Sequence, residues 1–139
     1  MPKTAPLQSL LEVLGQKVYD FGEAVSSANV VKLSVNFSIA AAIEAMAEAF
    51  TLAEKNGIDR TKVAELFGET LFACPVSQEY GKAIAEHKYE PAGFKLSLGL
   101  KDITLALQTA QASNLPMHAF SQFSSQPVSR SNGQRKRRS

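Results

Sequence analysis

The chain contains no proline or glycine between Asn29 and Asn56, within its longest stretch free of both. Proline and glycine are the residues that most disfavour the interior of a helix, so this stretch predicts one long α-helix. Gly57 follows Lys55 and Asn56, and a glycine just past a cation is typical of a helix C-terminus. A helix of this length must form the axis of the fold, because every other segment is shorter.

Small and apolar residues cover most of this predicted helix. Leu33, Phe37, Ile43 and Phe50 recur along it, with six alanines between positions 40 and 49. A helix that is apolar on most sides is expected to be covered by neighbours. The alanines would let another helix approach closely, and that helix could belong to this chain or to a second subunit. We therefore expect a central helix that also supports a homodimer or higher oligomer.

Three shorter helices are expected after the long one. Asp59 is a suitable N-cap for the first, and Pro75 precedes the second, in which Gly81 disfavours the helix. Ser97 is a suitable N-cap for the third, which Asn114 to Pro116 should end. The fold class predicted for the bulk of the chain is all-α, a helical bundle built around one long central helix.

The two ends of the chain differ from this helical middle. Lys17 to Phe21 resembles a β-strand, and one strand cannot form a sheet alone. We therefore expect residues 1–24 to be the end of a Rossmann domain that is otherwise missing, and residues 25–118 to be the helical domain. Residues 119–139 are rich in serine, glutamine and arginine, which predicts a disordered basic tail.

Composition excludes several classes of function. Five of the fifteen lysines and arginines lie in the last ten residues, so the rest of the chain is mildly acidic and offers no broad phosphate-binding face. Cys74 is the only cysteine, which excludes an internal disulfide and a cysteine-based metal cage, and it is expected to be a small core residue. We find neither a signal peptide nor an apolar run near 20 residues, so we expect a cytoplasmic protein with no membrane contact.

Lys32 and Asn36 lie four positions apart, so they share one face of the long helix, among apolar neighbours. The spacing alone leaves two interpretations open. The lysine can extend its ammonium to water while the asparagine bonds a nearby carbonyl. Alternatively, the ammonium donates a proton to a substrate carbonyl and the asparagine fixes its position.

Lys101 and Asp102 are expected near the start of the last helix. Asp102 would complement the positive helix end there, which needs no functional explanation. Lys101 has no such structural reason, and it is either solvated or functional. The chain contains no GxGxxG dinucleotide loop, and its two histidines form no evident metal set.

Three segments taken in order resemble one family. They are "NVVKLSVNF", "AIEAMAEAFTLAEKNGID" and "FKLSLGLKDITLALQTAQASNLPM". Together, over roughly residues 15–118, they resemble the C-terminal helical domain of the β-hydroxyacid dehydrogenases. This family includes 3-hydroxyisobutyrate dehydrogenase and the glyoxylate and succinic semialdehyde reductases. The resemblance implies a preceding Rossmann domain that binds NAD or NADP, and a helical domain that closes the active site and forms the dimer.

The resemblance also implies roles for four residues. Lys32 matches the catalytic lysine of the family, and Asn36 matches the asparagine that supports both the lysine and the substrate. Lys101 matches the lysine that approaches the cofactor, and Phe94 matches the aromatic residue before it. The implied reaction transfers hydride between the nicotinamide and a small 3-hydroxyacid or semialdehyde.

Three hypotheses follow. The first is the C-terminal domain of an NAD(P)-dependent oxidoreductase that is inactive without its Rossmann half, which leaves open whether this chain is itself an enzyme. The second is a non-catalytic helical dimerisation module. The third, and least favoured, is that the basic run "RKRR" binds nucleic acid.

Overall fold

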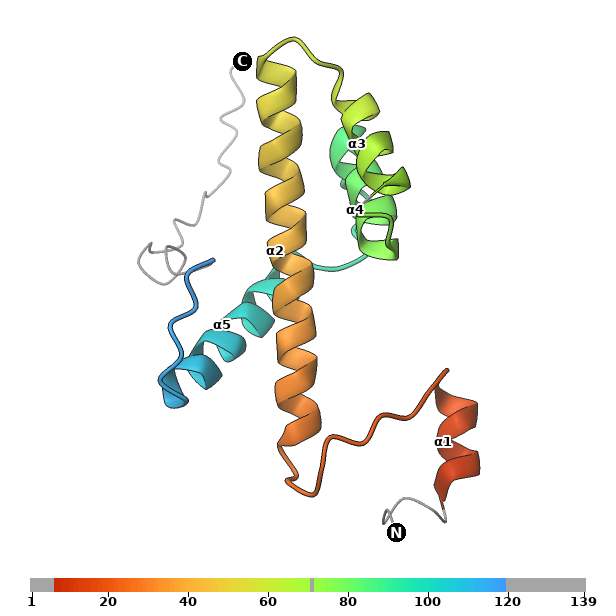
Figure 1. The fold of residues 1–139 in the computed structure, drawn as a ribbon, viewed down its shortest axis with the longest axis vertical. Helices are drawn as coiled ribbons and strands as arrows, with labels where there is room; N and C mark the ends of the chain where they lie inside the picture. The colour runs from red at the N-terminus through yellow and green to blue at the C-terminus, as the bar shows by residue number, and fades with distance from the viewer. Residues whose placement is uncertain (1–6, 71, 120–139) are drawn as a thin grey trace, which may run out of the picture.

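The fold is described from a computed structural model, which describes residues 7–70 and 72–119. These residues form five helices and no strand: α1 (Gln8–Leu14), α2 (Ser27–Lys55), α3 (Arg60–Glu69), α4 (Pro75–Ala85) and α5 (Leu96–Ala112). Helix α2 is the axis, with α3 and α4 packed on one side of its C-terminal half and α5 on the other side (Figure 1). In the described part, α1 packs against no other helix. The predicted all-α fold around one central helix is confirmed.

The expected strand and tail stay predictions. Residues 17–22 have no regular secondary structure in the described chain. A strand at Lys17 to Phe21 would need partner strands, so its place in a Rossmann sheet is untested. Apart from Ala119, the expected tail lies outside the described residues, and so does the "RKRR" run.

Helix α2 begins two residues before the predicted start and ends at Lys55. Its C-terminus has two hydrogen bonds typical of a glycine-ended helix. The amide of Ile58 donates to the carbonyl of Ala53, and that of Gly57 donates to the carbonyl of Glu54, both at 3.0 Å. Gly57 has φ +76°, a backbone conformation that a side chain would strain. The glycine signal for the end of this helix is therefore confirmed.

Helices α4 and α5 end in the same left-handed turn without a glycine. His87 after α4 has φ 52°, and Asn114 after α5 has φ 54°. At the end of α5, the amide of Leu115 donates to the carbonyl of Ala110 at 2.9 Å. Asparagine tolerates this conformation better than most residues, which is why the chain can turn at position 114 as predicted.

The starts of the shorter helices partly match the sequence. Asp59 is the N-cap of α3, and its carboxylate accepts the amide of Thr61 at 2.8 Å and the Thr61 hydroxyl at 2.6 Å. These hydrogen bonds hold the pKa of the Asp59 carboxyl below its usual value, because they favour the ionised form. The predicted N-cap at Asp59 is confirmed.

The predicted N-cap of α5 is wrong. Helix α5 begins at Leu96, so Ser97 lies inside its first turn and Lys95 is the N-cap. The carbonyl of Lys95 already accepts the amides of Leu98 and Gly99, at 2.9 and 3.2 Å. The chain therefore turns before the serine, and no side chain caps this helix.

The expectation that Cys74 is a core residue is also wrong, because the cysteine is exposed. It is the N-cap of α4, with extended backbone at φ −139° and ψ 161°. The residue before a proline is restricted to such conformations, and Pro75 occupies the first position of the helix. This local geometry places the thiol at the helix start, away from the packed face.

The core lies where α2, α3 and α4 meet. Met46 and Phe50 of α2 pack with Ile84 and Ala85 of α4, and Phe50 is fully buried. Phe67 of α3 meets the Phe50 ring edge-on, with ring centroids 5.4 Å apart. Apolar burial and aromatic contact therefore hold the C-terminal half of α2 in place.

Arg60 joins three helices at one end of this core. From the first position of α3, its guanidinium donates to Glu54 of α2 at 3.1 Å and to the carbonyl of Ile84 in α4 at 3.0 Å. It also lies 2.7 Å from Nε2 of His87. A guanidinium can only donate, so that histidine nitrogen must be the unprotonated acceptor. Arg60 thereby gives the Ile84 carbonyl at the end of α4 a second donor, beside the amide of His87 at 3.3 Å.

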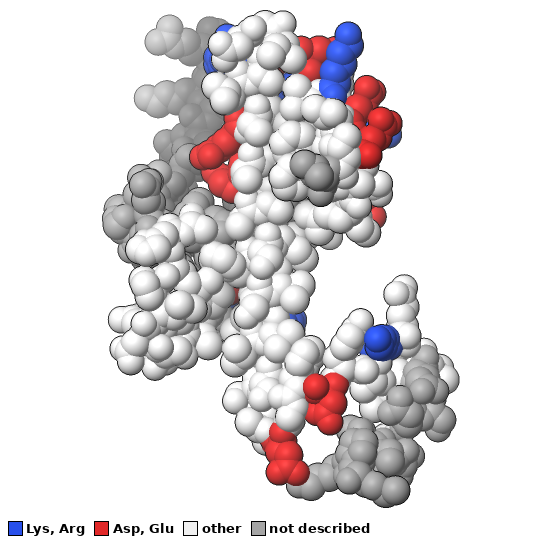
Figure 2. Space-filling view, in the orientation of Figure 1, with Lys and Arg blue, Asp and Glu red and all other residues white. Residues whose placement is uncertain are grey.

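Helix α2 is also long and apolar enough to cross a membrane, by length and composition alone. One 18-residue window has a mean hydropathy of 1.5, and 11% of that window is buried. This corrects the expectation that no stretch approaches a spanning length, although the central helix of a soluble protein passes the same test. Figure 2 shows the middle of α2 free of charged side chains on the face in view. The helix therefore keeps apolar surface after three described helices have packed on it.

Candidate functional site

The crossing of α2 and α5 brings two predicted functional segments together. In the described chain, α5 packs against no helix other than α2. Ala106 and Ala110 are buried on α5, and Leu33 is buried on α2. Alanines four positions apart form a narrow stripe that lets two helices approach closely. Asp102 lies one turn before Ala106 on the same stripe, so its side chain faces α2.

Asn36 and Asp102 are joined by a hydrogen bond across this crossing. Nδ2 of Asn36 donates to Oδ2 of Asp102 at 2.8 Å, in a partly buried position, between residues 66 apart in sequence. The bond is the direct link between the KxxxN segment of α2 and the KD segment of α5. The structure thus brings the predicted site residue Asn36 together with Asp102, which the sequence alone assigned to a helix end.

The helix-end explanation of Asp102 does not hold. The first turn of α5 contains no acidic residue, and Asp102 is in the second turn. The field of a helix end falls off within the first turn, so it gives this carboxylate little stabilisation. The signal that could have revealed its role is the stripe that it shares with Ala106 and Ala110, which marks the face toward α2.

Lys32 lies one turn before Asn36 on α2 and is exposed. It takes part in neither of the ion pairs found among the described residues, which join Arg60 to Glu54 and Lys82 to Glu86. Its ammonium is therefore accessible to solvent and to a bound molecule. A solvated lysine and a proton donor would both look like this, so the role of Lys32 stays a prediction.

Phe94 and Lys101 lie at the N-terminal end of α5, beside Asp102. The Phe94 ring packs over Gly99, where a Cβ would lie 3.4 Å from Cε1 of the ring, and the Phe94 side chain stays half exposed. Lys101 is exposed. An accessible aromatic ring can stack on a base, and an accessible ammonium can pair with a phosphate. The role of Phe94 and Lys101 at a cofactor stays a prediction.

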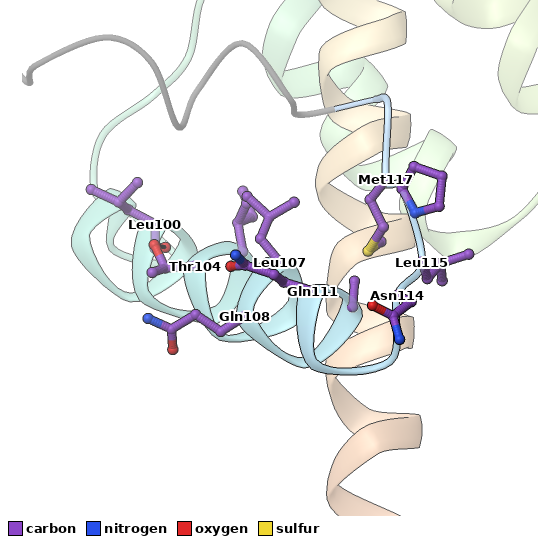
Figure 3. A pocket seen from close by; sticks show the side chains of 11 residues that line it. Leu100, Thr104, Leu107, Gln108, Gln111, Asn114, Leu115 and Met117 are labelled. Atoms are coloured by element: carbon purple, nitrogen blue, oxygen red, sulfur yellow. Dashed lines mark hydrogen bonds between the residues drawn. The ribbon is translucent and has the colours of Figure 1, made fainter.

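A groove of about 680 Å³ lies away from these residues. It runs along α5 and the segment that follows it, and Leu100, Leu107, Gln111 and Met117 are among its lining residues (Figure 3). Lys32, Asn36 and Asp102 do not line it. The groove is therefore not the candidate site.

Comparison with known families identifies the family of this chain. A family model described as "NAD-binding of NADP-dependent 3-hydroxyisobutyrate dehydrogenase" matches residues 26–135. The chain belongs to this family. The resemblance to the C-terminal helical region of the β-hydroxyacid dehydrogenases is thereby confirmed, and the match extends past residue 118, where the resemblance was expected to end.

Individual relatives agree with this family. The chain is 46% identical over 110 residues to the "Uncharacterized oxidoreductase YfjR" of Bacillus subtilis, covering 78% of this chain and 38% of that protein. It is 30% identical over 118 residues to 2-hydroxy-3-oxopropionate reductase of Escherichia coli, covering 84% of this chain and 40% of that protein. It is also 30% identical over 122 residues to mitochondrial 3-hydroxyisobutyrate dehydrogenase of Drosophila melanogaster, covering 80% and 36%. The chain spans about two fifths of the length of these relatives.

Proposed function

We propose that this chain is the helical domain of an NAD(P)-dependent oxidoreductase that transfers hydride between the cofactor and a small 3-hydroxyacid or semialdehyde. The family match over residues 26–135 carries the proposal. Because the chain spans about two fifths of its relatives, catalysis would need a dinucleotide-binding domain as well, and the chain alone would be inactive. A purely non-catalytic dimerisation module is not favoured, because the relatives are named as oxidoreductases.

The names of two relatives support the substrate class. They specify 2-hydroxy-3-oxopropionate and 3-hydroxyisobutyrate, which are small carboxylic acids with an oxygen function on the third carbon. We propose that this chain contributes to a site for a molecule of the same class. The cofactor would be NAD or NADP.

The proposed chemistry assigns one proton to Lys32. When bound, the cofactor supplies or accepts the hydride. During reduction, the Lys32 ammonium donates a proton to the carbonyl oxygen, and during oxidation the neutral amine takes the hydroxyl proton. Asn36, one turn along α2, would hold the lysine and the substrate in place, which lowers the entropic part of the barrier. Phe94 and Lys101 would contact the cofactor from the start of α5.

The role of Lys32 can be tested in a protein that carries both domains. We would join this chain to the part of the Escherichia coli reductase that the match leaves uncovered, and follow nicotinamide absorbance with 2-hydroxy-3-oxopropionate. Lys32→Ala should lower kcat by about 100-fold or more, because the proton donor is lost.

The matched control is Lys88→Ala, which removes an exposed lysine that follows α4 and belongs to neither α2 nor α5. It should leave the rate unchanged. A Lys32→Ala protein as active as its parent would remove Lys32 from the mechanism.

A further inference from the structure

The orientation of the Asn36 amide is fixed by chemistry. An ionised carboxylate offers only acceptors, whereas an amide has a donor end, Nδ2, and an acceptor end, Oδ1. The 2.8 Å contact with Asp102 is therefore possible only with Nδ2 toward the carboxylate. The opposite orientation would place two acceptor oxygens against each other.

This orientation determines what Asn36 can offer to a ligand. With Nδ2 turned to Asp102, Oδ1 points away from the carboxylate, and no donor to it is found among the described residues. The free end of the amide is thus a hydrogen-bond acceptor. Groups that can donate a hydrogen bond to it include the ammonium of Lys32, one turn away, and a substrate hydroxyl.

We propose that Asp102 is a positioning residue that holds Asn36 with its carbonyl oxygen toward the reacting group. The inference rests on the function proposed above and extends it, because it specifies the chemistry that Asn36 presents. Asn36 accepts a hydrogen bond from the alcohol form of the substrate or from the Lys32 ammonium. Asp102 acts only through Asn36 and does not need to touch the substrate.

The hydrogen bond also suits the packing of the two helices. Asp102 precedes Ala106 and Ala110 on the stripe that faces α2, so the carboxylate lies on the packed face of α5. A charged hydrogen bond at such a crossing is stronger than a neutral one and resists rotation of either side chain. The packing of α5 against α2 therefore also places the carboxylate that orients Asn36.

The first test uses this chain and nuclear magnetic resonance of its side-chain amides. In the parent, a carboxylate hydrogen bond should shift one Nδ2 proton of Asn36 away from the signals of Asn29, which is exposed near the start of α2. Asp102→Asn and Asp102→Leu should both move the Asn36 signals toward those of Asn29. Asp102→Asn keeps the size of the side chain and removes its charge, whereas Asp102→Leu is larger and offers no acceptor. Unchanged Asn36 signals in both variants would overturn the inference.

The second test is the exchange of the two residues. Asn36→Asp alone places two carboxylates against each other and should weaken the α2–α5 contact. Adding Asp102→Asn gives a carboxylate at position 36 and an amide at position 102, which restores the hydrogen bond and still leaves an acceptor toward the site. The double variant should recover folding stability lost in Asn36→Asp, and failure to recover any would contradict the proposed pairing.

The third test measures rate in the two-domain protein described above. Asp102→Leu should lower kcat by roughly 10- to 100-fold with a smaller change in KM, because it misplaces the group that Asn36 holds. A variant with displaced amide signals but full kcat would overturn the positioning role. If every form is inactive while the amide signals behave as expected, the hydride-transfer proposal fails and the assignment of Asn36 as a fixed acceptor stands.

Discussion

Cys74 shows how one hydrogen bond changes the chemistry of an exposed side chain. Its sulfur lies 3.5 Å from the hydroxyl of Ser77, one turn into α4. The Ser77 hydroxyl and then its backbone amide lower the pKa of the Cys74 thiol from its usual value, because both stabilise the thiolate. The thiolate is the nucleophilic form of cysteine, so this contact should make the thiol more reactive near neutral pH.

Removing the hydroxyl should reverse this effect. In Ser77→Ala, the pKa of Cys74 rises toward its usual value, the thiolate fraction near neutral pH falls, and alkylation by iodoacetamide slows. Ser97→Ala, which removes a hydroxyl from α5 instead, should leave the rate as it is. Both variants should react at the parental rate in denaturant. Equal native rates for Ser77→Ala and the parent would show that the hydrogen bond does not control this thiol.

At the scale of the helix, backbone conformation requires one glycine, Gly57, but not another, Gly81. Gly57 ends α2 with φ +76°, a conformation that a side chain disfavours. Gly81 lies inside α4, where a Cβ would be 3.6 Å from the Met46 sulfur, an ordinary van der Waals distance. The first glycine is required by its backbone conformation. The second lowers helix stability, and the neighbouring helix does not come so close that a Cβ would be excluded.

The two alanine substitutions should therefore change stability in opposite directions. Gly57→Ala should lower the free energy of unfolding by about 1 kcal/mol, because alanine is strained at positive φ. Gly81→Ala should raise it by about 0.5–1 kcal/mol through helix propensity and a smaller unfolded-state entropy. Urea unfolding followed by circular dichroism measures both. A destabilised Gly81→Ala would mean that the contact with α2 is tighter than the distances indicate.

At the scale of the whole molecule, α2 remains partly uncovered. Val30, Val35 and Leu52 are large apolar residues of this helix that stay exposed after the described helices have packed. Exposed large apolar side chains on the central helix suit a contact with another chain. We keep the homodimer or oligomer as a proposal, with α2 as the contact element, and a cytoplasmic location likewise stays a prediction.

Sedimentation velocity tests this proposal. The chain should associate as its concentration rises through the micromolar range, because burial of apolar surface favours contact. Val35→Gln should weaken association while leaving the helical circular dichroism signal intact. Leu96→Gln, at an exposed position on α5, is the matched control. A chain that remains a folded monomer throughout would rule out self-association through α2.

The roles of the site residues were predicted to different depths. The spacing of Lys32 and Asn36 placed them on one helix face, but it left open whether either is functional. Their proposed roles, and those of Phe94 and Lys101, come from the family resemblance and still await measurement. Asp102 was assigned to a helix end from its sequence position, and only the packed structure connected it to Asn36.

The sequence by itself determined the long helix, its glycine end, the N-cap at Asp59 and the all-α class. These features depend on backbone preferences and on the spacing of apolar residues, which act over a few neighbouring positions. Only the tertiary structure decided which faces of α2 and α5 meet, where α5 begins, and that Asn36 bonds an aspartate 66 residues away. The reason is that a contact between distant segments depends on the crossing of two packed helices, and no local pattern specifies that crossing.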